Sequence, residues 1–198
     1  LDIYDITHKA ACLLKPRLER DEQWSAFASQ AGSTKSRIQQ TTWSFLVPPA
    51  PRSKARYMNL GELIAWGIKT LAILENPGPE VLRHGTAESL NASLGWLKRF
   101  RKKLTGWSEM EQTIDVVVDF VRTQGLYRGA EKELRRRLGR LSLGPAAAPL
   151  GEDLERFVAE QAKQLRRGER LPGSSEVIES CFGKFKALER EQSKGGVT

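Results

Sequence analysis

The segment Leu60–Leu74, with the sequence LGELIAWGIKTLAIL, decides the fold class. Its apolar side chains recur at helical intervals, at Leu60, Leu63, Ile64, Ile68, Leu71 and Leu74. Residues three and four positions apart share one face of an α-helix. The Asn76-Pro77-Gly78-Pro79 stretch that follows cannot continue a helix. We therefore predict an amphipathic helix that packs one face against a core.

The same spacing extends toward the N-terminus. It predicts helices over 7–14 and 17–31, with a kink or restart at Pro16 and a stop at Gly32. Ser33 or Thr34 is expected to begin a further helix that runs to about residue 46. Ahead of these helices, residues 1–4 alternate between apolar and polar side chains, which is typical of the end of a strand.

The spacing also extends toward the C-terminus, where helices are predicted over 86–104, 109–124, 128–141, 151–168 and 175–190. Thr105-Gly106 and Gln124-Gly125 are the expected breaks around the second of these. Val116–Val118 favours a strand by composition, but the flanking apolar residues keep the helical spacing, so we predict a helix there. The expected fold class is mainly α, with at most one short strand, near residues 1–4.

The composition restricts the class of protein. The chain has 198 residues, of which 39% are hydrophobic and 28% charged, as in one large or two small globular domains. The net charge of +8 favours a polyanionic partner such as nucleic acid or an anionic membrane surface. Cys12 and Cys181 cannot form a disulfide framework and indicate a reducing compartment. No apolar run approaches the roughly 20 residues of a membrane helix, so we expect no membrane partner.

Two carboxylate segments could carry chemistry, and they lie at opposite ends of the chain. Asp5 follows the strand-like residues and precedes a helix, where its carboxylate could bind a metal ion or cap the helix. At the other end, Glu176 and Glu179 lie on neighbouring faces near the start of a predicted helix. Lys186 lies two turns beyond Glu179. One face thus offers a carboxylate for a cation and an ammonium for a phosphate, although early acids and late bases are also ordinary helix design.

Three clusters of cations lie within the predicted helices, around residues 98–103, 135–140 and 163–170. Such side chains bind phosphates with little dependence on sequence, whereas the alternative is a solvated helix face. Together with the net charge, they favour contact with DNA. The expected phosphate- and DNA-binding residues are Lys186, Lys98, Arg99, Arg101, Lys102, Arg135, Arg136, Arg137, Arg166 and Arg167, with Lys103, Arg140, Lys163 and Arg170 in the same clusters.

Two motifs resemble those of a known enzyme family. Glu179-Ser180-Cys181-Phe182-Gly183-Lys184-Phe185-Lys186 resembles the last acidic motif, E-S-x-F-x-x-x-K, of DDE-type insertion-sequence transposases. Tyr4-Asp5-Ile6-Thr7-His8-Lys9 is similar to the surroundings of the second aspartate in that family, and residues 171–179 resemble one bacterial group of it. The resemblance is sharpest over 1–24 and 171–198 and loose over the helical middle. Glu179 matches the motif better than Glu176, because the residue seven beyond Glu176 is Gly183.

The resemblance implies a fold and a division into domains. It implies edge pieces of an RNase H-like α/β fold, one short strand and one helix, that bracket a helical insertion domain. The implied boundaries are 1–30 for the piece with the second acidic motif, 31–170 for the insertion domain and 171–198 for the helix with the third acidic motif. The first aspartate of the family would lie ahead of Leu1, so the segment alone is expected to be inactive.

The resemblance also implies an activity. Asp5 and Glu179 would be the catalytic metal ligands, with Glu176 as the alternative third acid and two Mg²⁺ (or Mn²⁺) ions in the full-length enzyme. The implied reaction is phosphodiester cleavage and strand transfer at the ends of a mobile element. The implied partners are double-stranded DNA and, in the active complex, further copies of the chain, in the cytoplasm and nucleoid. The alternative is a non-catalytic α-helical domain that binds DNA or a protein.

The distance between the two acids in the sequence sets a condition on the fold. Asp5 and Glu179 are 174 positions apart, so they can share a site only if the helices between them return to their starting point. The structure can test this return.

Overall fold

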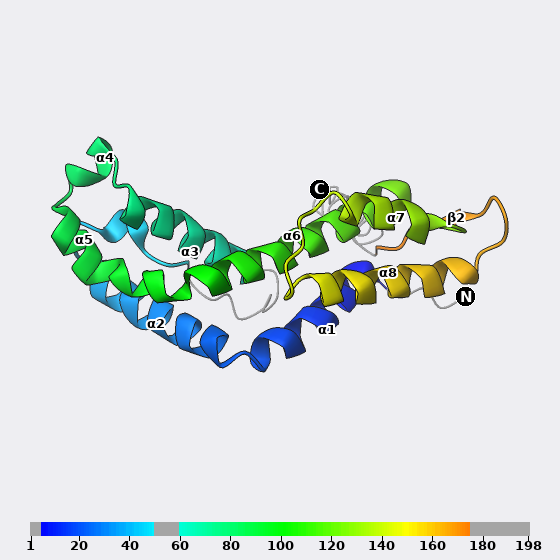
Figure 1. Cartoon of the computed structure of the whole chain (residues 1–198), viewed down its shortest axis with the longest axis horizontal. Helices are drawn as coiled ribbons and strands as arrows, with labels where there is room; N and C mark the ends of the chain where they lie inside the picture. Colours follow the sequence, from blue (N-terminus) through cyan, green and yellow to red (C-terminus); the bar gives the residue numbers. More distant parts are fainter. Residues whose placement is uncertain (1–4, 50–59, 175–198) are drawn as a thin grey trace, which may run out of the picture.

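The computed structural model describes residues 5–49 and 60–174, and these residues are mainly α-helical, as predicted. α6 (Arg101–Gln124), the longest helix of the described chain, runs along the middle of an elongated body (Figure 1). Other elements gather where α6 begins: α2 (Glu22–Ile38), α3 (Leu60–Glu75), α4 (Pro79–Leu82), α5 (Ala87–Leu94) and the 3-10 helices η1 (Ser44–Leu46) and η2 (Gly95–Phe100). Around its second half lie α1 (Ile6–Glu19), α7 (Ala130–Leu138) and α8 (Ala148–Lys163).

The strongest helix prediction is confirmed. The segment that decides the fold class forms α3, which ends at Glu75 before the Pro-Gly stretch. Its apolar face packs on α6 and on the 3-10 helix η2. The β-prone residues Val116–Val118 lie inside α6, as their helical flanks predicted, and α6 ends at the predicted break before Gly125.

Two predicted helix breaks, at Gly32 and Gly106, are wrong, and so is the restart that was one of the two alternatives at Pro16. α1 continues through Pro16, α2 continues through Gly32, and α6 continues through Gly106. Burial on both sides of each residue explains the continuity, because the apolar face of the helix runs on unbroken. Leu14 and Leu18, for example, lie on either side of Pro16 and are 3% and 2% exposed. Burying side chains of this size outweighs the one backbone hydrogen bond that proline removes.

Other helix boundaries also differ from the predictions. The break between α1 and α2 lies at Asp21, whose carboxylate accepts a hydrogen bond from the Gln23 N–H at 3.0 Å and begins α2. The helix predicted up to residue 46 is only the end of α2 followed by η1. The helix predicted over 86–104 is divided into α5, η2 and the start of α6, and α7 and α8 are shorter or shifted relative to the predicted ranges.

The described residues contain one sheet of two short strands, so the prediction of at most one strand is wrong. β1 (Leu126–Tyr127) pairs antiparallel with β2 (Arg170–Leu171), so that Leu126 faces Leu171. Gly125 precedes β1 with φ +69°, and a Cβ there would lie 2.9 Å from the Leu171 carbonyl oxygen, so a glycine is required. Two-residue strands are too short for any periodicity. The strand predicted over 1–4 and the helix predicted over 175–190 lie outside the described residues.

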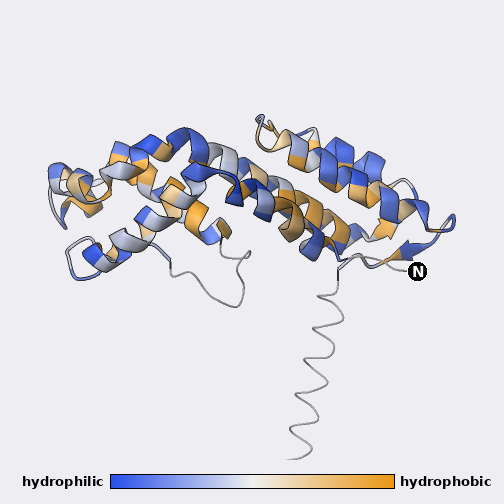
Figure 2. Ribbon diagram, turned by 90° about the horizontal axis from the view of Figure 1, so that it is seen from below, coloured by the Kyte–Doolittle hydropathy of each residue, from blue (hydrophilic) through white to orange (hydrophobic). Residues whose placement is uncertain are grey.

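Aromatic side chains form the core around the start of α6. The Phe27 ring lies 5.3 Å from Trp107 and 5.5 Å from Phe100, and the Trp24 ring meets Trp107 edge-on at 5.0 Å. From the sequence, the tryptophans are expected to be core anchors rather than base-stacking platforms. Four of them pack in or against the core, as expected: Trp43, Trp66, Trp96 and Trp107. Each helix thus has a hydrophobic side and a hydrophilic side (Figure 2).

We predict that Phe27→Ala destabilises the protein by about 3 to 5 kcal/mol, because it leaves a cavity among stacked aromatic rings. Urea unfolding followed by circular dichroism measures this free energy. Phe45→Ala is the matched control, since the Phe45 ring is 49% exposed and its removal should cost less than about 1 kcal/mol. Equal losses in the two variants would contradict the aromatic core.

Candidate metal and nucleic-acid sites

Asp5 is the cap of α1. Its Oδ1 accepts a hydrogen bond from the His8 N–H at 2.9 Å, and its backbone is extended. This is the capping role that the sequence left open as an alternative to metal binding. A carboxylate has about four lone-pair positions, so one capping hydrogen bond does not prevent it from binding a cation.

The residue after Asp5 joins the two ends of the described chain. The Ile6 N–H donates a hydrogen bond to the Gly173 carbonyl at 2.9 Å. The surroundings of this hydrogen bond are protected from water: the donor residue Ile6 is 0% exposed, and Ser174, which follows the acceptor, is 5% exposed. The helical excursion from Asp5 to Gly173 therefore ends where it began, as the separation of the two carboxylate segments required.

The structure places Asp5 but not its predicted partners. Glu176, Glu179 and Lys186 lie outside the described residues. In the sequence, Glu176 follows Gly173 by three positions and Glu179 follows it by six. Within residues 5–49 and 60–174, no group of three or more acids, histidines or cysteines could hold a metal ion. Asp5 is thus the described end of a possible site whose other carboxylates follow Ser174.

The first cation cluster is largely engaged within the protein. The Lys98 ammonium donates to Asn91 at 2.7 Å, and Lys103 forms an ion pair with Asp21 at 2.9 Å. Arg99 donates to Gln30, and Arg101 forms an ion pair with Glu75. In this cluster, Lys102 is exposed and has no polar partner among the described residues. Most cations of this first cluster therefore make contacts within the protein and are not available to a charged ligand.

The second cluster, on α7, is half engaged. Arg135 Nε donates to Glu155 on α8 at 2.9 Å, and Arg137 pairs with Glu133 at 3.3 Å while stacking over the Phe120 ring. Arg136 and Arg140 are exposed and have no partner within the described chain. This pattern makes Arg136 the better candidate for a phosphate contact among the three predicted residues of α7.

The third cluster is the least neutralised. Lys163, Arg166 and Arg167 are exposed, and none of their side chains forms an ion pair with a described residue. Arg170 stacks on the Tyr127 ring at 4.5 Å. The structure adds Arg128 to this cluster, because β1 and β2 bring residues 127–128 beside residues 167–170.

These residues surround a recess of about 350 Å³, the arginine notch, lined by Tyr127, Arg128, Arg167, Gly168, Glu169 and Arg170. Sequence analysis missed Arg128, which belongs to none of the three clusters. Its position depends on the pairing of two strands that are distant in sequence, Leu126 with Leu171 and Tyr127 with Arg170, and no local pattern predicts that pairing. The one local signal is that Arg128 and Arg167 both precede a glycine.

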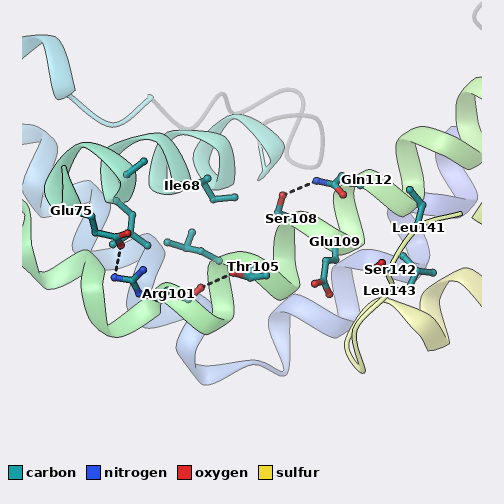
Figure 3. A pocket seen from close by; sticks show the side chains of 13 residues that line it. Ile68, Glu75, Arg101, Thr105, Ser108, Glu109, Gln112, Leu141, Ser142 and Leu143 are labelled. Carbon is teal, nitrogen blue, oxygen red and sulfur yellow. Dashed lines mark hydrogen bonds and ion pairs between the residues drawn. The ribbon is translucent and has the colours of Figure 1, made fainter. Parts of the chain in front are cut away.

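A larger groove of about 600 Å³ lies between α3, α6 and the loop 141–143 (Figure 3). Leu71 and Leu104 are among its lining residues. The ion pair of Arg101 with Glu75 lies at one end of the groove (Figure 3). At the other end Glu109 accepts a hydrogen bond from the Gly144 N–H at 3.0 Å. The charged side chains of this groove thus make structural contacts, and it offers no cluster of groups for catalysis.

Two acids on α6 are perturbed by their surroundings. Burial, with the nearby charge of Asp115, raises the pKa of Glu111 to about 7, and burial also raises the pKa of Asp115. The Glu111 side chain packs against the first turn of α3. Its Oε2 lies so close to Gly61 that a Cβ built on that glycine would be 2.8 Å away. No sequence pattern distinguishes these acids from the other glutamates and aspartates of α6.

Comparison with protein-family models, with curated proteins and with solved structures found no match for this chain. In the described residues, no helix is both long enough and apolar enough to cross a membrane. What the protein does must therefore be inferred from its own residues and their arrangement.

We predict that the stability of the protein contains a pH-dependent contribution from Glu111. The folded pKa lies above the ordinary 4.5, so the folded state holds the proton more tightly. That stabilisation is complete below about pH 4.5 and is lost as the pH rises through about 7. Because Glu111 is only partly buried, we expect Glu111→Gln to be more stable than the parent by about 1 to 2 kcal/mol at pH 8 and nearly equal to it at pH 4.

Urea unfolding of the two proteins between pH 4 and 8 measures this difference. Glu160→Gln is the control, because Glu160 is an exposed glutamate on α8 and its loss removes the same charge from the surface. A Glu111→Gln difference that does not change with pH would show that Glu111 titrates normally.

Proposed function

We propose that this chain carries the second and third acids of a DDE-type transposase, an enzyme of RNase H-like fold that cleaves DNA phosphodiesters and joins DNA strands. Asp5 and Glu179 would bind the divalent cation, with Glu176 as the alternative third acid. The helical body between them would be an insertion domain that binds double-stranded DNA. Mg²⁺ or Mn²⁺ bound there would supply Lewis-acid activation of the reacting oxygens.

The observation that supports this proposal most is the hydrogen bond from Ile6 to Gly173. It places the start of the segment that contains both glutamates beside Asp5. Six residues of fully extended chain span at most about 20 Å, so covalent geometry alone keeps Glu179 in the neighbourhood of Asp5. A helical excursion that returned elsewhere would have made a shared site impossible.

The chemistry of the donor set also fits the proposal. Carboxylate oxygens are the ligands that Mg²⁺ prefers in proteins, usually with water and substrate phosphate completing the coordination. The cap holds one oxygen of Asp5 on the His8 N–H and so restricts the orientation of the carboxylate. Lys186, two turns beyond Glu179 in the predicted helix, would contact a phosphate of the DNA.

A non-catalytic DNA-binding domain is the second candidate, and the cap itself favours it. Asp5 already has a structural function at the start of α1, so its presence does not require a metal. Both candidates expect binding to duplex DNA through exposed arginines and lysines. They differ in whether Asp5 and Glu179 bind one cation together.

We predict that Fe²⁺, used as a substitute for Mg²⁺, directs cleavage of the protein backbone near residues 5 and 179 in the presence of ascorbate and peroxide. Radicals generated at a bound ion cut only nearby backbone, so two cut sites far apart in sequence would report a shared site. The fragments are sized by mass spectrometry. Excess Mg²⁺ should suppress both cuts, and Glu179→Gln should reduce both.

Two further variants make the result specific. Asp5→Asn removes the charge but keeps the cap, because asparagine caps helices as well as aspartate does, so it should lose cleavage without losing stability. Asp5→Ala should in addition lose about 1 kcal/mol of stability. Cleavage that survives Glu179→Gln and is lost in Glu176→Gln would assign the ligand to Glu176. No paired cuts, or cuts unaffected by any of these changes, would favour the non-catalytic candidate.

A further inference from the structure

The arginine notch is lined by three arginines, and two of them have charges that no described carboxylate neutralises. Arg128 and Arg167 are exposed, and neither side chain forms an ion pair or hydrogen bond with any described residue. This distinguishes them from Arg101 and Arg135, which form ion pairs with Glu75 and Glu155. Two guanidinium groups that line one recess without a carboxylate partner repel each other, and an anion bound between them reduces that repulsion.

The third arginine of the notch has a fixed position. The Arg170 guanidinium stacks on the Tyr127 ring at 4.5 Å, and the Tyr127 hydroxyl donates a hydrogen bond to Glu133 at 2.9 Å. Stacking leaves the N–H groups at the edge of the guanidinium plane, where they can donate to an oxyanion. The strand pair fixes both residues, since Tyr127 and Arg170 face each other in the register.

The notch also contains one carboxylate, which is engaged by the backbone. Glu169 Oε2 accepts a hydrogen bond from the Arg166 N–H at 2.8 Å and so closes the turn between α8 and β2. Three arginines against one glutamate leave the recess positive. The glutamate therefore shapes the turn without neutralising the arginines.

The backbone of the notch is built from two glycine turns. Gly129 has φ +97° and Gly168 has φ +85°, values that L residues rarely adopt, and each follows one of the unpartnered arginines. No atom lies within 4 Å of a Cβ built at either position. The space beside both glycines, next to Arg128 and Arg167, is therefore open.

We propose that the arginine notch binds a backbone phosphate of duplex DNA beside the carboxylate site, and the second part of this statement rests on the proposed function. Arg170 precedes Gly173 by three residues, a span of at most about 10 Å, and Gly173 is hydrogen-bonded to the residue next to Asp5. One guanidinium group can donate two parallel hydrogen bonds to two oxygens of the same phosphate. Such paired bonds would hold a DNA strand in one orientation. The notch positions the DNA strand and does not read its bases.

The test compares duplex binding by the parent protein and by Arg128→Ala/Arg167→Ala, measured by fluorescence anisotropy at several salt concentrations. We expect about tenfold weaker binding at low salt for the double variant. The slope of log affinity against log salt should fall by about 0.9, the value for one lost phosphate contact. Both side chains are exposed, so thermal unfolding should be unchanged.

Three controls make the outcome specific. Arg83→Ala/Lys69→Ala removes two exposed cations at the other end of the body and should leave the slope nearly unchanged (Figure 1). Arg83 directly follows α4 and pairs with Glu80, and Lys69 lies on α3. Arg128→Lys/Arg167→Lys should keep the salt slope but weaken binding, because lysine retains the charge and loses the paired hydrogen bonds. If both double alanine variants lost the same binding affinity and salt slope, the notch would contribute only through the net charge of the protein, and the proposal would be overturned. An unchanged slope in Arg128→Ala/Arg167→Ala would also overturn it.

The test separates this proposal from the proposed function. Metal-directed cleavage at residues 5 and 179 does not depend on Arg128 or Arg167, so it should persist in the notch variant. If cleavage persists and the salt slope does not change, the notch proposal fails alone. If the slope changes and no paired cleavage is found, the notch remains a DNA phosphate site of a non-catalytic protein.

Discussion

The closure between Ile6 and Gly173 is the constraint on which the arrangement depends. Local helix formation accounts for α1 and α8 separately, but it does not bring their distant ends together. Burial of Ile6 anchors the start of α1, and the ion pair of Arg17 with Asp153, at 2.5 Å, ties the same helix to α8. Because these side chains are partly shielded from water, the pair is worth more than an exposed one. The Arg17 guanidinium accordingly lowers the pKa of Asp153.

The second principle is how the surplus of positive charge is distributed. A net charge of +8 describes the whole chain, but ion pairs and hydrogen bonds engage most cations near Phe100 and half of those on α7. Arg128 and Arg167, which form no ion pair or hydrogen bond with a described residue, lie instead in the recess where β1 meets β2. Electrostatic attraction to DNA is therefore expected to be directional, strongest at the end of the body that carries Asp5.

Sequence patterns predicted the parts of the fold that depend on neighbours along the chain. The apolar spacing of Leu60–Leu74 defined α3, and the tryptophans fell in the core. The patterns failed where tertiary packing outweighs local preference, as at Pro16 and Gly106, and where pairing is both short and distant, as between Tyr127 and Arg170. The candidate site divides in the same way, since Asp5 was identified from its local context whereas Arg128 needed the strand register. Whether Glu179 joins Asp5 remains a prediction.

A cap and a metal ligand make compatible demands on Asp5. The His8 N–H donates directly to the Asp5 carboxylate and holds its Oδ1 at the N-terminus of α1. The hydrogen bond also restricts the rotation of the side chain, which reduces the entropy that metal binding would otherwise have to overcome. α1 is in turn held by α2, α6 and α8, so the carboxylate stands on a rigid element. Capping and ligation are thus compatible on one carboxylate, and the cost of losing the cap can be measured apart from the cost of losing the charge.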